Sequence, residues 1–337
     1  MKKYTYCVGV WNDNPGASRF GEATRSPKSV MEKIKMLKNL GVMAVEAHDN
    51  EITSAMAPAI RKLLDDEGME MGMYTPNFFW DAQYANGALA SHDAAIRRSA
   101  IDRFKKAMDT AHVLRAHVVV YWNGQEGSDV ALGKCSLDAL SHLQDAFNEI
   151  LEYDASQYGD QALRIAVEPK PNEPRCHMLL PTVGDALAFA MSLNPRHNHR
   201  MGVNPESAHS IMIGLNYVKD LESALFYKRL FHIHLNDQEG PKYDQDLAFA
   251  SAHLKRGLET LAVLVHHGYT GLIGFDLNPL RTDDEASRSQ VIKTSIRNFE
   301  GLLAIAHKLD WQQIQIWRNK GAFSELDAYL DDLLLYK

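Results

Sequence analysis

Residues 163–170 read LRIAVEPK, an apolar run that ends in the carboxylate of Glu168. A short apolar run that contains branched side chains is typical of a strand buried on both faces of a parallel sheet. Similar runs recur along the chain, at residues 4–10, 43–47, 70–74, 116–122, 200–204, 229–235 and 271–277. The sequence therefore predicts eight buried strands.

Helical patterns separate these runs. Amphipathic stretches cover residues 27–39, 55–67, 93–114, 137–156, 182–193, 251–267 and 284–308. In the first stretch we expect Ser26 to be the N-cap and Pro27 to occupy the first helical position. Regular alternation of strands and helices implies a parallel sheet, and eight such units favour a (β/α)8 TIM barrel of the α/β class over a doubly wound sheet. No GxGxxG or Walker A motif follows any of the strands, which disfavours a nucleotide-binding fold.

The chain contains no linker rich in Gly, Pro or Ser, so we expect one barrel domain at residues 1–310. The remaining residues, 311–337, are predicted to form a short C-terminal helical tail. Its apolar residues recur at helical spacing, at Leu326, Tyr329, Leu330, Leu333 and Leu334. This tail should pack on the barrel or on a neighbouring subunit.

Composition narrows the class of protein. The formal net charge of -7 disfavours nucleic acid and anionic membranes as partners. No apolar stretch is long enough for a signal peptide or a membrane span. The cysteines Cys7, Cys135 and Cys176 lie far apart and are odd in number, which argues against a disulfide framework. We therefore expect a cytoplasmic protein.

Polar side chains follow several of the predicted strands at the point where each strand ends. In a TIM barrel, catalytic groups come from the carboxyl ends of the strands and the loops after them. Any one of these residues could be a cap, a solvated turn or a hydrogen-bonded core residue. Together they predict a carboxylate-rich site for Mg²⁺, Mn²⁺ or Co²⁺. The candidate ligands are Glu168, Glu206, His209, His234, Asp244, Asp246 and Asp276.

Further residues near these strand ends are candidates for contacts with a substrate. Lys170 lies two residues after Glu168 and could bind a substrate oxygen. His48 follows a strand and has carboxylates beside it, which can fix the imidazole tautomer and raise its basicity. Phe79 and Trp122 could form the apolar wall of a sugar site, or could simply belong to the core.

Several longer segments carry a resemblance to a known family. The chain resembles the xylose isomerases, which are metal-dependent aldose–ketose isomerases with a (β/α)8 barrel, from about residue 4 to residue 308. The most specific matching segments are EPKPNEP from Glu168, LLPTVG from Leu179, GVNPE from Gly202, FHI from Phe231, GPKYDQDL from Gly240 and FD at residues 275–276. The segments at Trp11, FGEATR from Phe20, HD at residues 48–49 and WNGQEG from Trp122 match in the same order.

The resemblance implies two divalent cations in each subunit, Mn²⁺ or Mg²⁺ with Co²⁺ as an alternative. One cation would be bound by Glu168, Glu206, His234 and Asp276. The other would share Glu206 and would add His209, Asp244 and Asp246. The implied reaction is a 1,2-hydride shift between adjacent carbons of an opened monosaccharide.

The same resemblance implies roles for residues around the cations. His48, with Glu51 as its partner, would assist ring opening of the cyclic sugar. Lys170 and Asp246 would act at the reacting end of the substrate. The substrate-binding residues would be Trp11, Phe20, Phe79, Trp122, Lys170 and Asn278, with Phe20 reaching into a neighbouring subunit of a homodimer or homotetramer.

Three positions depart from the family pattern. Xylose isomerases carry Asp at the position of His234, Lys at the position of Asn278 and Asp at the position of Glu51. The imidazole at 234 makes the first set of ligands more similar to that of rhamnose isomerases and ketose epimerases. Two alternatives to a xylose isomerase-like enzyme therefore stay open: a ketose epimerase of the same superfamily, and a sugar- or metal-binding homologue without catalysis.

Overall fold

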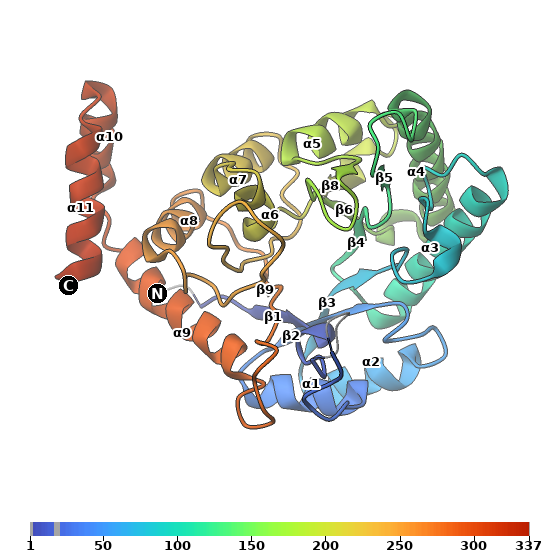
Figure 1. The fold of residues 1–337 in the computed structure, drawn as a ribbon, viewed down its shortest axis with the longest axis horizontal. Helices are drawn as coiled ribbons and strands as arrows, with labels where there is room; N and C mark the ends of the chain where they lie inside the picture. Colours follow the sequence, from blue (N-terminus) through green and yellow to red (C-terminus); the bar gives the residue numbers. More distant parts are fainter. Residues whose placement is uncertain (1–2, 17–20, 337) are drawn as a thin grey trace.

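The computed structural model describes residues 3–16 and 21–336. In this part of the chain a parallel sheet has the strand order β8-β6-β4-β3-β2-β1-β9 and curls into a barrel (Figure 1). Its strands are β1 Tyr6–Gly9, β2 Ala44–His48, β3 Glu70–Thr75, β4 Val118–Trp122, β6 Ile165–Glu168, β8 Met201–Val203 and β9 Ile273–Phe275. The predicted TIM barrel of the α/β class is confirmed.

Residues 229–235 occupy the eighth position of the barrel without forming a regular strand. On the β8 side, the Phe231 amide donates to the Val203 carbonyl at 3.1 Å, and the His234 amide donates to the Pro205 carbonyl at 3.0 Å. On the β9 side, Gly274 exchanges backbone hydrogen bonds with the same segment. The prediction of a regular strand here was wrong, because Pro205 has no N–H group and interrupts the ladder beside β8. These isolated bonds nevertheless close the barrel.

Helices surround the sheet, as Figure 1 shows. Those that correspond to the predicted amphipathic stretches are α1 Val30–Asn39, α2 Ala57–Asp66, α3 Ala94–Leu114, α4 Ser136–Tyr158, α5 Val183–Ser192, α8 Leu254–His266 and α9 Gln290–Ala306. The predicted start of the first helix was wrong. Ser29, rather than Ser26, is the N-cap, since Ser29 and Glu32 form a capping box.

Two helices between β8 and residues 229–235 were not predicted, α6 Ser207–Met212 and α7 Tyr217–Phe226. The first is too short for helical periodicity to be visible in the sequence. The second did carry a signal, because the Asn216 side chain caps its first turn. The shorter elements are η1 Val10–Asn12, η2 Ala82–Tyr84, η3 Gly159–Gln161 and η4 Asn198–Arg200, and the antiparallel pair β5 Gly127–Ser128 and β7 His177–Met178.

Apolar residues fill two regions. The larger core lies between the sheet and the surrounding helices. A smaller group lies inside the barrel and consists of Met73, Val118, Val120 and Ala166. Polar residues occupy the rest of the barrel interior, including Glu46, His232 and His234, which are all buried. Buried charge on this scale requires specific partners.

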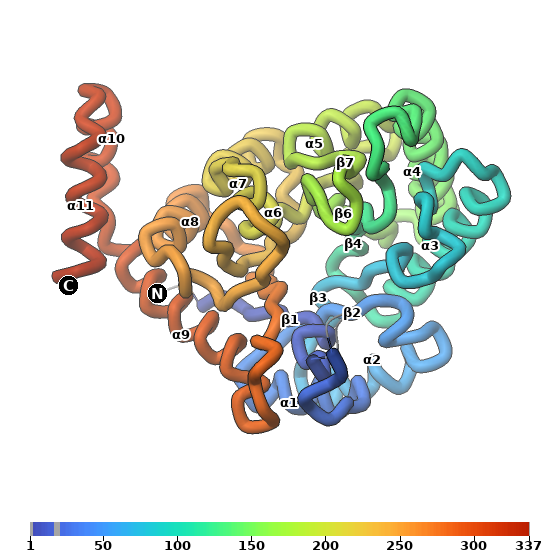
Figure 2. Tube along the Cα trace, in the orientation of Figure 1, coloured from blue at the N-terminus to red at the C-terminus, as the bar shows by residue number. Residues whose placement is uncertain are grey.

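The C-terminal residues form the helices α10 Trp311–Lys320 and α11 Phe323–Leu335, which extend away from the barrel beside α8 and α9 (Figure 2). Leu330 and Leu333 of α11 are buried, and the Lys255 ammonium of α8 lies 2.8 Å from the Asp331 carboxylate. The tail is therefore helical and touches α8. That residues 1–310 and 311–337 act as separate units stays a prediction.

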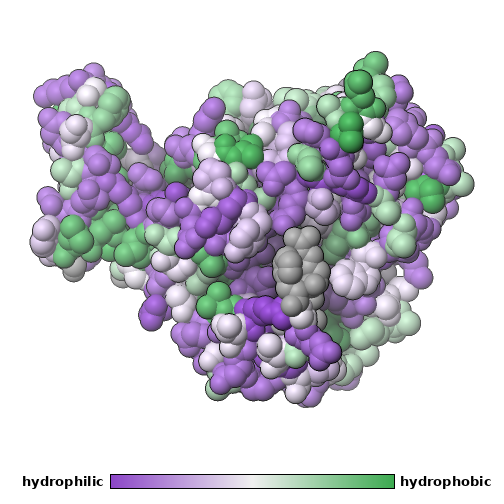
Figure 3. All heavy atoms as spheres, viewed as in Figure 1, coloured by the Kyte–Doolittle hydropathy of each residue, from purple (hydrophilic) through white to green (hydrophobic). Residues whose placement is uncertain are grey.

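The described part of the chain contains no helix of the length and hydrophobicity that crossing a bilayer requires. The face drawn in Figure 3 is dominated by hydrophilic side chains, with apolar residues scattered among them.

Candidate metal and sugar site

A cavity of about 190 Å³ lies at the carboxyl ends of the strands. Cavities that hold drug-sized ligands are usually larger, on the order of 300–1,000 Å³, so this one suits a small molecule. Its lining combines carboxylates, imidazoles, one lysine and aromatic rings. The lining residues are Trp11, His48, Met73, Thr75, Phe79, Val120, Trp122, Glu168, Lys170, His209, His234, Asp244, Asp246 and Asp276.

The first group of potential metal ligands consists of Glu168, Glu206, His234 and Asp276, whose ligand atoms all lie within 4.8 Å of one another. Glu168 ends β6, Glu206 is the N-cap of α6, and Asp276 follows β9 directly. The Nδ1 atom of His234 lies 3.0 Å from a Glu168 carboxylate oxygen, 3.7 Å from one of Glu206 and 3.9 Å from one of Asp276. The four predicted ligands of the first cation are thus brought together.

The second group consists of Glu206, His209 and Asp244, again with ligand atoms within 4.8 Å. His209 lies one helical turn after Glu206, and its Nε2 atom is 3.3 Å from Glu206 Oε1 and 3.1 Å from Asp244 Oδ2. Asp246 lines the same cavity. Asp246 has a left-handed backbone, with φ of +47°. A non-glycine residue in that conformation is often found at a functional site.

The carboxylates of this site repel one another when no cation is bound. Burial and the charge of Glu206 raise the pKa of Asp276 to about 7. Burial and the charges of Asp244 and Asp276 raise the pKa of Asp246 far above its usual range. Burial opposes a charge on the imidazole of His234, but the carboxylates of Glu46 and Glu168 outweigh it and raise the pKa of that ring. Protons therefore offset like-charge repulsion that a divalent cation would also offset.

Some buried atoms of the site have no hydrogen-bond partner, which also suits a cation; we call these orphaned atoms. The buried atoms without a hydrogen-bond partner include Glu206 Oε2 and Asp244 Oδ1. Such atoms are uncommon in folded proteins, because leaving one unpaired costs about 1–3 kcal/mol. Carboxylate oxygens with one or two imidazoles are a donor set that suits Mg²⁺ or Mn²⁺. The residues present therefore fit divalent cations at both groups.

Lys170 lies beside the second group. Its ammonium donates to Asp244 Oδ2 at 2.7 Å and lies 5.4 Å from the centre of the Trp122 ring. Burial would lower the pKa of Lys170, but the charges of Asp244 and Asp246 outweigh burial and raise it. The lysine is therefore charged inside the cavity, where it can bind an anionic or polarised oxygen.

His48 is placed in the cavity wall by a carboxylate and by aromatic rings. Its Nδ1 atom lies 3.0 Å from a Glu51 carboxylate oxygen, which leaves Nε2 as the nitrogen available to a ligand. The ring centroid lies 4.6 Å from that of Trp11 and 5.5 Å from that of Phe79. Trp11 also donates its indole N–H to Asp276 at 2.7 Å, and Phe79 packs edge-on against Trp122. The predicted wall residues thus form one continuous surface.

One predicted substrate-binding residue, Asn278, is not among the described residues that line the cavity. Asn278 is exposed, and its side-chain oxygen accepts a hydrogen bond from Asn14 at 2.7 Å. Phe20 lies outside the described residues, so its predicted contact with a neighbouring subunit stays a prediction.

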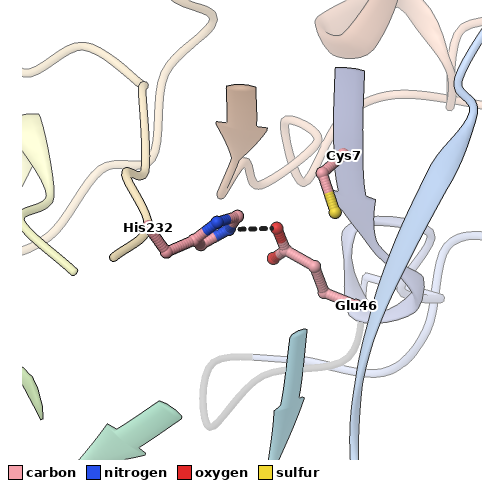
Figure 4. A group of neighbouring side chains, drawn as sticks. All are labelled: Cys7, Glu46 and His232. Carbon is pink, nitrogen blue, oxygen red and sulfur yellow. Dashed lines mark hydrogen bonds and ion pairs between the residues drawn. The ribbon is translucent and has the colours of Figure 1, made fainter. Parts of the chain in front are cut away.

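Sequence reasoning missed the amides that hold the carboxylates and a glutamate below them. Asn236 donates to Glu206 at 2.8 Å and to Asp246 at 3.1 Å, while Asn204 donates to Glu168 at 2.7 Å. Two-residue alternation in the segment HIHLN, residues 232–236, puts Asn236 on the face of His234, so the sequence does carry a signal for this amide. Glu46 in β2 gave no such signal, because it occurs within an apolar run. Figure 4 shows its carboxylate between Cys7 and His232.

Comparison with known proteins identifies relatives. Residues 34–317 match the family described as "Xylose isomerase-like TIM barrel". The chain is 36% identical over 294 residues to a xylose isomerase of Thermus thermophilus, a match that covers 84% of this chain and 75% of that protein.

Solved structures with the same fold are more distant in sequence. A D-tagatose 3-epimerase-like protein superposes with a TM-score of 0.65 at 18% identity, covering 88% of this chain and 98% of that one. An L-ribulose 3-epimerase superposes with a TM-score of 0.67 at 14% identity, covering 91% and 96% of the two chains. Both comparisons establish the fold.

Proposed function

Because this chain belongs to the xylose isomerase-like TIM barrel family, we propose that it is a metal-dependent sugar isomerase that interconverts an aldose and a ketose. The observation that carries the proposal is the position of Glu206, which belongs to both groups of potential ligands. A carboxylate between two such groups is the arrangement expected of a bridging ligand in a site for two cations.

The proposed cations are Mn²⁺ or Mg²⁺, and bound there they would polarise the oxygens on the two adjacent substrate carbons between which the hydride moves. Around them, Lys170 would bind the oxygen at the carbonyl end of the opened sugar, since its ammonium is charged and lines the cavity. Asp246, which also lines the cavity, would take up and return a proton at the adjacent hydroxyl.

His48 would assist the opening of the cyclic sugar. The Glu51 carboxylate at 3.0 Å holds the proton on Nδ1, so the other ring nitrogen is left as a base for a substrate hydroxyl. The aromatic residues Trp11, Phe79 and Trp122 would exclude water from the reacting carbons and pack against the apolar face of the sugar.

A ketose epimerase is the second candidate. The imidazole of His234 in the first group supports it, as this residue is the clearest departure from the xylose isomerase pattern. An epimerase that uses one cation would have no need of His209, Asp244 and Asp246 as ligands. The convergence of His209 and Asp244 around Glu206 and Lys170 therefore supports the isomerase over the epimerase. A binding protein without catalysis is the third candidate, and the charged Lys170 in the cavity argues against it.

The proposal also covers the cellular compartment and the oligomeric state of the enzyme. We propose that it works in the cytoplasm, which the free thiols of Cys7, Cys135 and Cys176 support. We also propose a homodimer or homotetramer, with the C-terminal hairpin of α10 and α11 as one contact, because Ile316, Phe323 and Leu335 on it are exposed.

The test is a screen of aldoses and ketoses with the Mn²⁺-loaded protein, in which products are identified by NMR. The proposal expects conversion of at least one aldose into the corresponding ketose. With a C2-deuterated aldose, a hydride shift carries the label to C1 of the ketose, whereas loss of the label to water indicates transfer as a proton. Conversion only between ketoses that differ at one carbon would establish the epimerase instead.

A further inference from the structure

A buried carboxylate lies one imidazole ring away from the first group of ligands. Glu46 of β2 has no exposed surface, and its two carboxylate oxygens are bonded to different histidines. Oε2 lies 3.0 Å from His234 Nε2, and Oε1 lies 2.8 Å from His232 Nε2. Both histidines come from the irregular segment at residues 229–235. Glu46 thus connects the interior of the barrel to the ligand His234.

We propose that Glu46 is a positioning residue for the first cation, which it serves by fixing the ring of His234 and by supplying the negative charge that an imidazole lacks. This inference rests on the proposed metal site but not on the sugar or the reaction. Glu46 touches neither cation nor substrate, so its effect passes through His234 alone.

The geometry explains how the ring is fixed. Because Nε2 of His234 is bonded to Glu46, the ring must present Nδ1 to Glu168, Glu206 and Asp276. A cation bound by Nδ1 would leave the proton on Nε2, where it is donated to Glu46. A carboxylate that accepts from the second nitrogen of a metal-bound histidine fixes the tautomer and makes the first nitrogen a better donor.

The charges explain why a carboxylate is needed at this place. The first group contains three carboxylates and one imidazole. Glu46, bonded to that imidazole, is a fourth nearby carboxylate. Both oxygens of the buried Glu46 carboxylate lie at hydrogen-bond distance from an imidazole nitrogen, which is the pairing that a buried carboxylate requires.

The absence of a side chain at Gly274 leaves room for the imidazoles of His232 and His234 beside Glu46. A Cβ atom on Gly274 of β9 would lie 2.5 Å from the Ile233 carbonyl oxygen and 2.8 Å from atoms of both His232 and His234. Any larger residue at position 274 would therefore push the two imidazoles away from Glu46. The glycine, the histidines and the glutamate form one packed unit.

Glu46 also belongs to a trio with Cys7 and His232 that could itself be considered as a metal site (Figure 4). The hydrogen bonds argue against that reading. Each oxygen of Glu46 already has an imidazole partner, and no nitrogen or oxygen of the trio is among the orphaned buried atoms. Burial raises the pKa of the Cys7 thiol, which keeps it protonated and a donor to Glu46. The trio therefore completes the support of His234.

The experiment compares Mn²⁺ binding to the metal-free wild type and to Glu46→Gln, measured by calorimetry and by the EPR signal of free Mn²⁺. We expect binding at the first site to weaken about 10–100-fold, as for other supports of metal-bound histidines. Glu70→Gln, a change at an exposed glutamate at the start of β3, is the matched control and should bind as the wild type does. An unchanged affinity of a folded Glu46→Gln protein would overturn the proposal.

A second arm separates positioning from a general structural role. In a His234→Asp background the side chain at 234 carries its own charge and is too short to reach Glu46. There, Glu46→Gln should change Mn²⁺ affinity less than about twofold, because the effect passes through the imidazole. An equal loss in both backgrounds would show that Glu46 merely stabilises the fold.

The wild type itself provides a third readout that needs no variant. In the Mg²⁺-loaded protein, ¹⁵N correlation spectra of the His234 ring should show a proton on Nε2 and none on Nδ1. A proton on Nδ1 would contradict the proposal. A protein that binds Mn²⁺ but converts no sugar would contradict the proposed function, whereas the binding comparison would still decide the role of Glu46.

Discussion

Two clusters of buried and half-buried polar residues lie inside this barrel, and they differ in how well their atoms are paired. The upper cluster, at the carboxyl ends of the strands, comprises Glu168, Glu206, His209, His234, Asp244, Asp246 and Asp276. It contains orphaned atoms and carboxylates with raised pKa values. The lower cluster of Cys7, Glu46 and His232 has no orphaned nitrogen or oxygen atom, and the pKa of its glutamate is lowered.

The difference separates a binding site from a structural network. Unpaired, mutually repelling groups are costly in a folded protein unless something binds to them. A network whose members satisfy one another stabilises the conformation it holds. The upper cluster is thus arranged for ligands, while the lower cluster is arranged to hold one residue of the upper cluster in place.

Removal of metal should reduce sugar conversion more than any of the substitutions described below, because it acts only on the upper cluster. We expect dialysis against EDTA to abolish sugar conversion, and Mn²⁺ to restore it at least as well as Mg²⁺, since an imidazole ligand favours Mn²⁺. The measurement is product formation before and after metal is added back. Full activity of the metal-free protein would show that the upper cluster is not a metal site.

A change at Gly274 should disturb the lower cluster first. The Cβ atom of Gly274→Ala would overlap with His232 and His234, so we expect destabilisation of about 1–3 kcal/mol and weaker Mn²⁺ binding. Urea unfolding of the metal-free protein measures the first effect. Gly301→Ala is the control, because a Cβ there meets no atom within 4 Å. Equal stability of the two variants would mean that the lower cluster is loosely packed.

The two clusters should respond to pH in opposite directions in the metal-free protein. The folded-state pKa of Asp276 is about 7, above its ordinary value of 3.8, so its contribution to stability falls as pH rises from about 4 to 7. The pKa of Glu46 is lowered, so its contribution is lost only as pH falls below its ordinary value of 4.5.

Thermal unfolding between pH 5 and pH 8 tests this contrast. Asp276→Asn should flatten the decline in Tm over that range, whereas Glu46→Gln should lower Tm by a similar amount at each pH. A wild-type Tm that rises steadily between pH 5 and pH 8 without metal would contradict the assignment of charge to the upper cluster.

The smallest effect on activity and stability is expected for a substitution outside both clusters. Asn278 is exposed and bonded to Asn14 rather than directed into the cavity lining. We expect Asn278→Ala to change kcat/KM less than about threefold and stability by no more than about 0.5 kcal/mol. Steady-state kinetics on the best substrate measure the first. A loss above tenfold would return Asn278 to the substrate site for which the sequence proposed it.

Sequence patterns were sufficient for the barrel and for the members of the upper cluster. Glu168 and Asp276 follow apolar runs, and parallel strands bring their carboxyl ends to one side of the barrel. Two-residue alternation in the segment HIHLN puts His234 and Asn236 on one face. Local patterns of this kind carry the information because the strand itself positions the residue.

The lower cluster could not be predicted in the same way. Glu46 and His234 are 188 positions apart, and their contact depends on how the barrel closes. Closure in turn depends on residues 229–235, which Pro205 keeps from forming a regular strand. Glu46 lies within an apolar run and Gly274 lies against His232 and His234. Neither residue signals in the sequence that the two imidazoles will meet Glu46.

The most direct test of the central claim is the number of Mn²⁺ ions that one chain binds. Calorimetric titration of the metal-free wild type should give two ions per chain, since two groups of ligands meet at Glu206. Glu206→Gln should lose both tight sites, whereas Glu222→Gln, a change on α7 remote from the cavity, should keep them. One ion or none in the wild type, or two tight sites in Glu206→Gln, would contradict a centre for two cations.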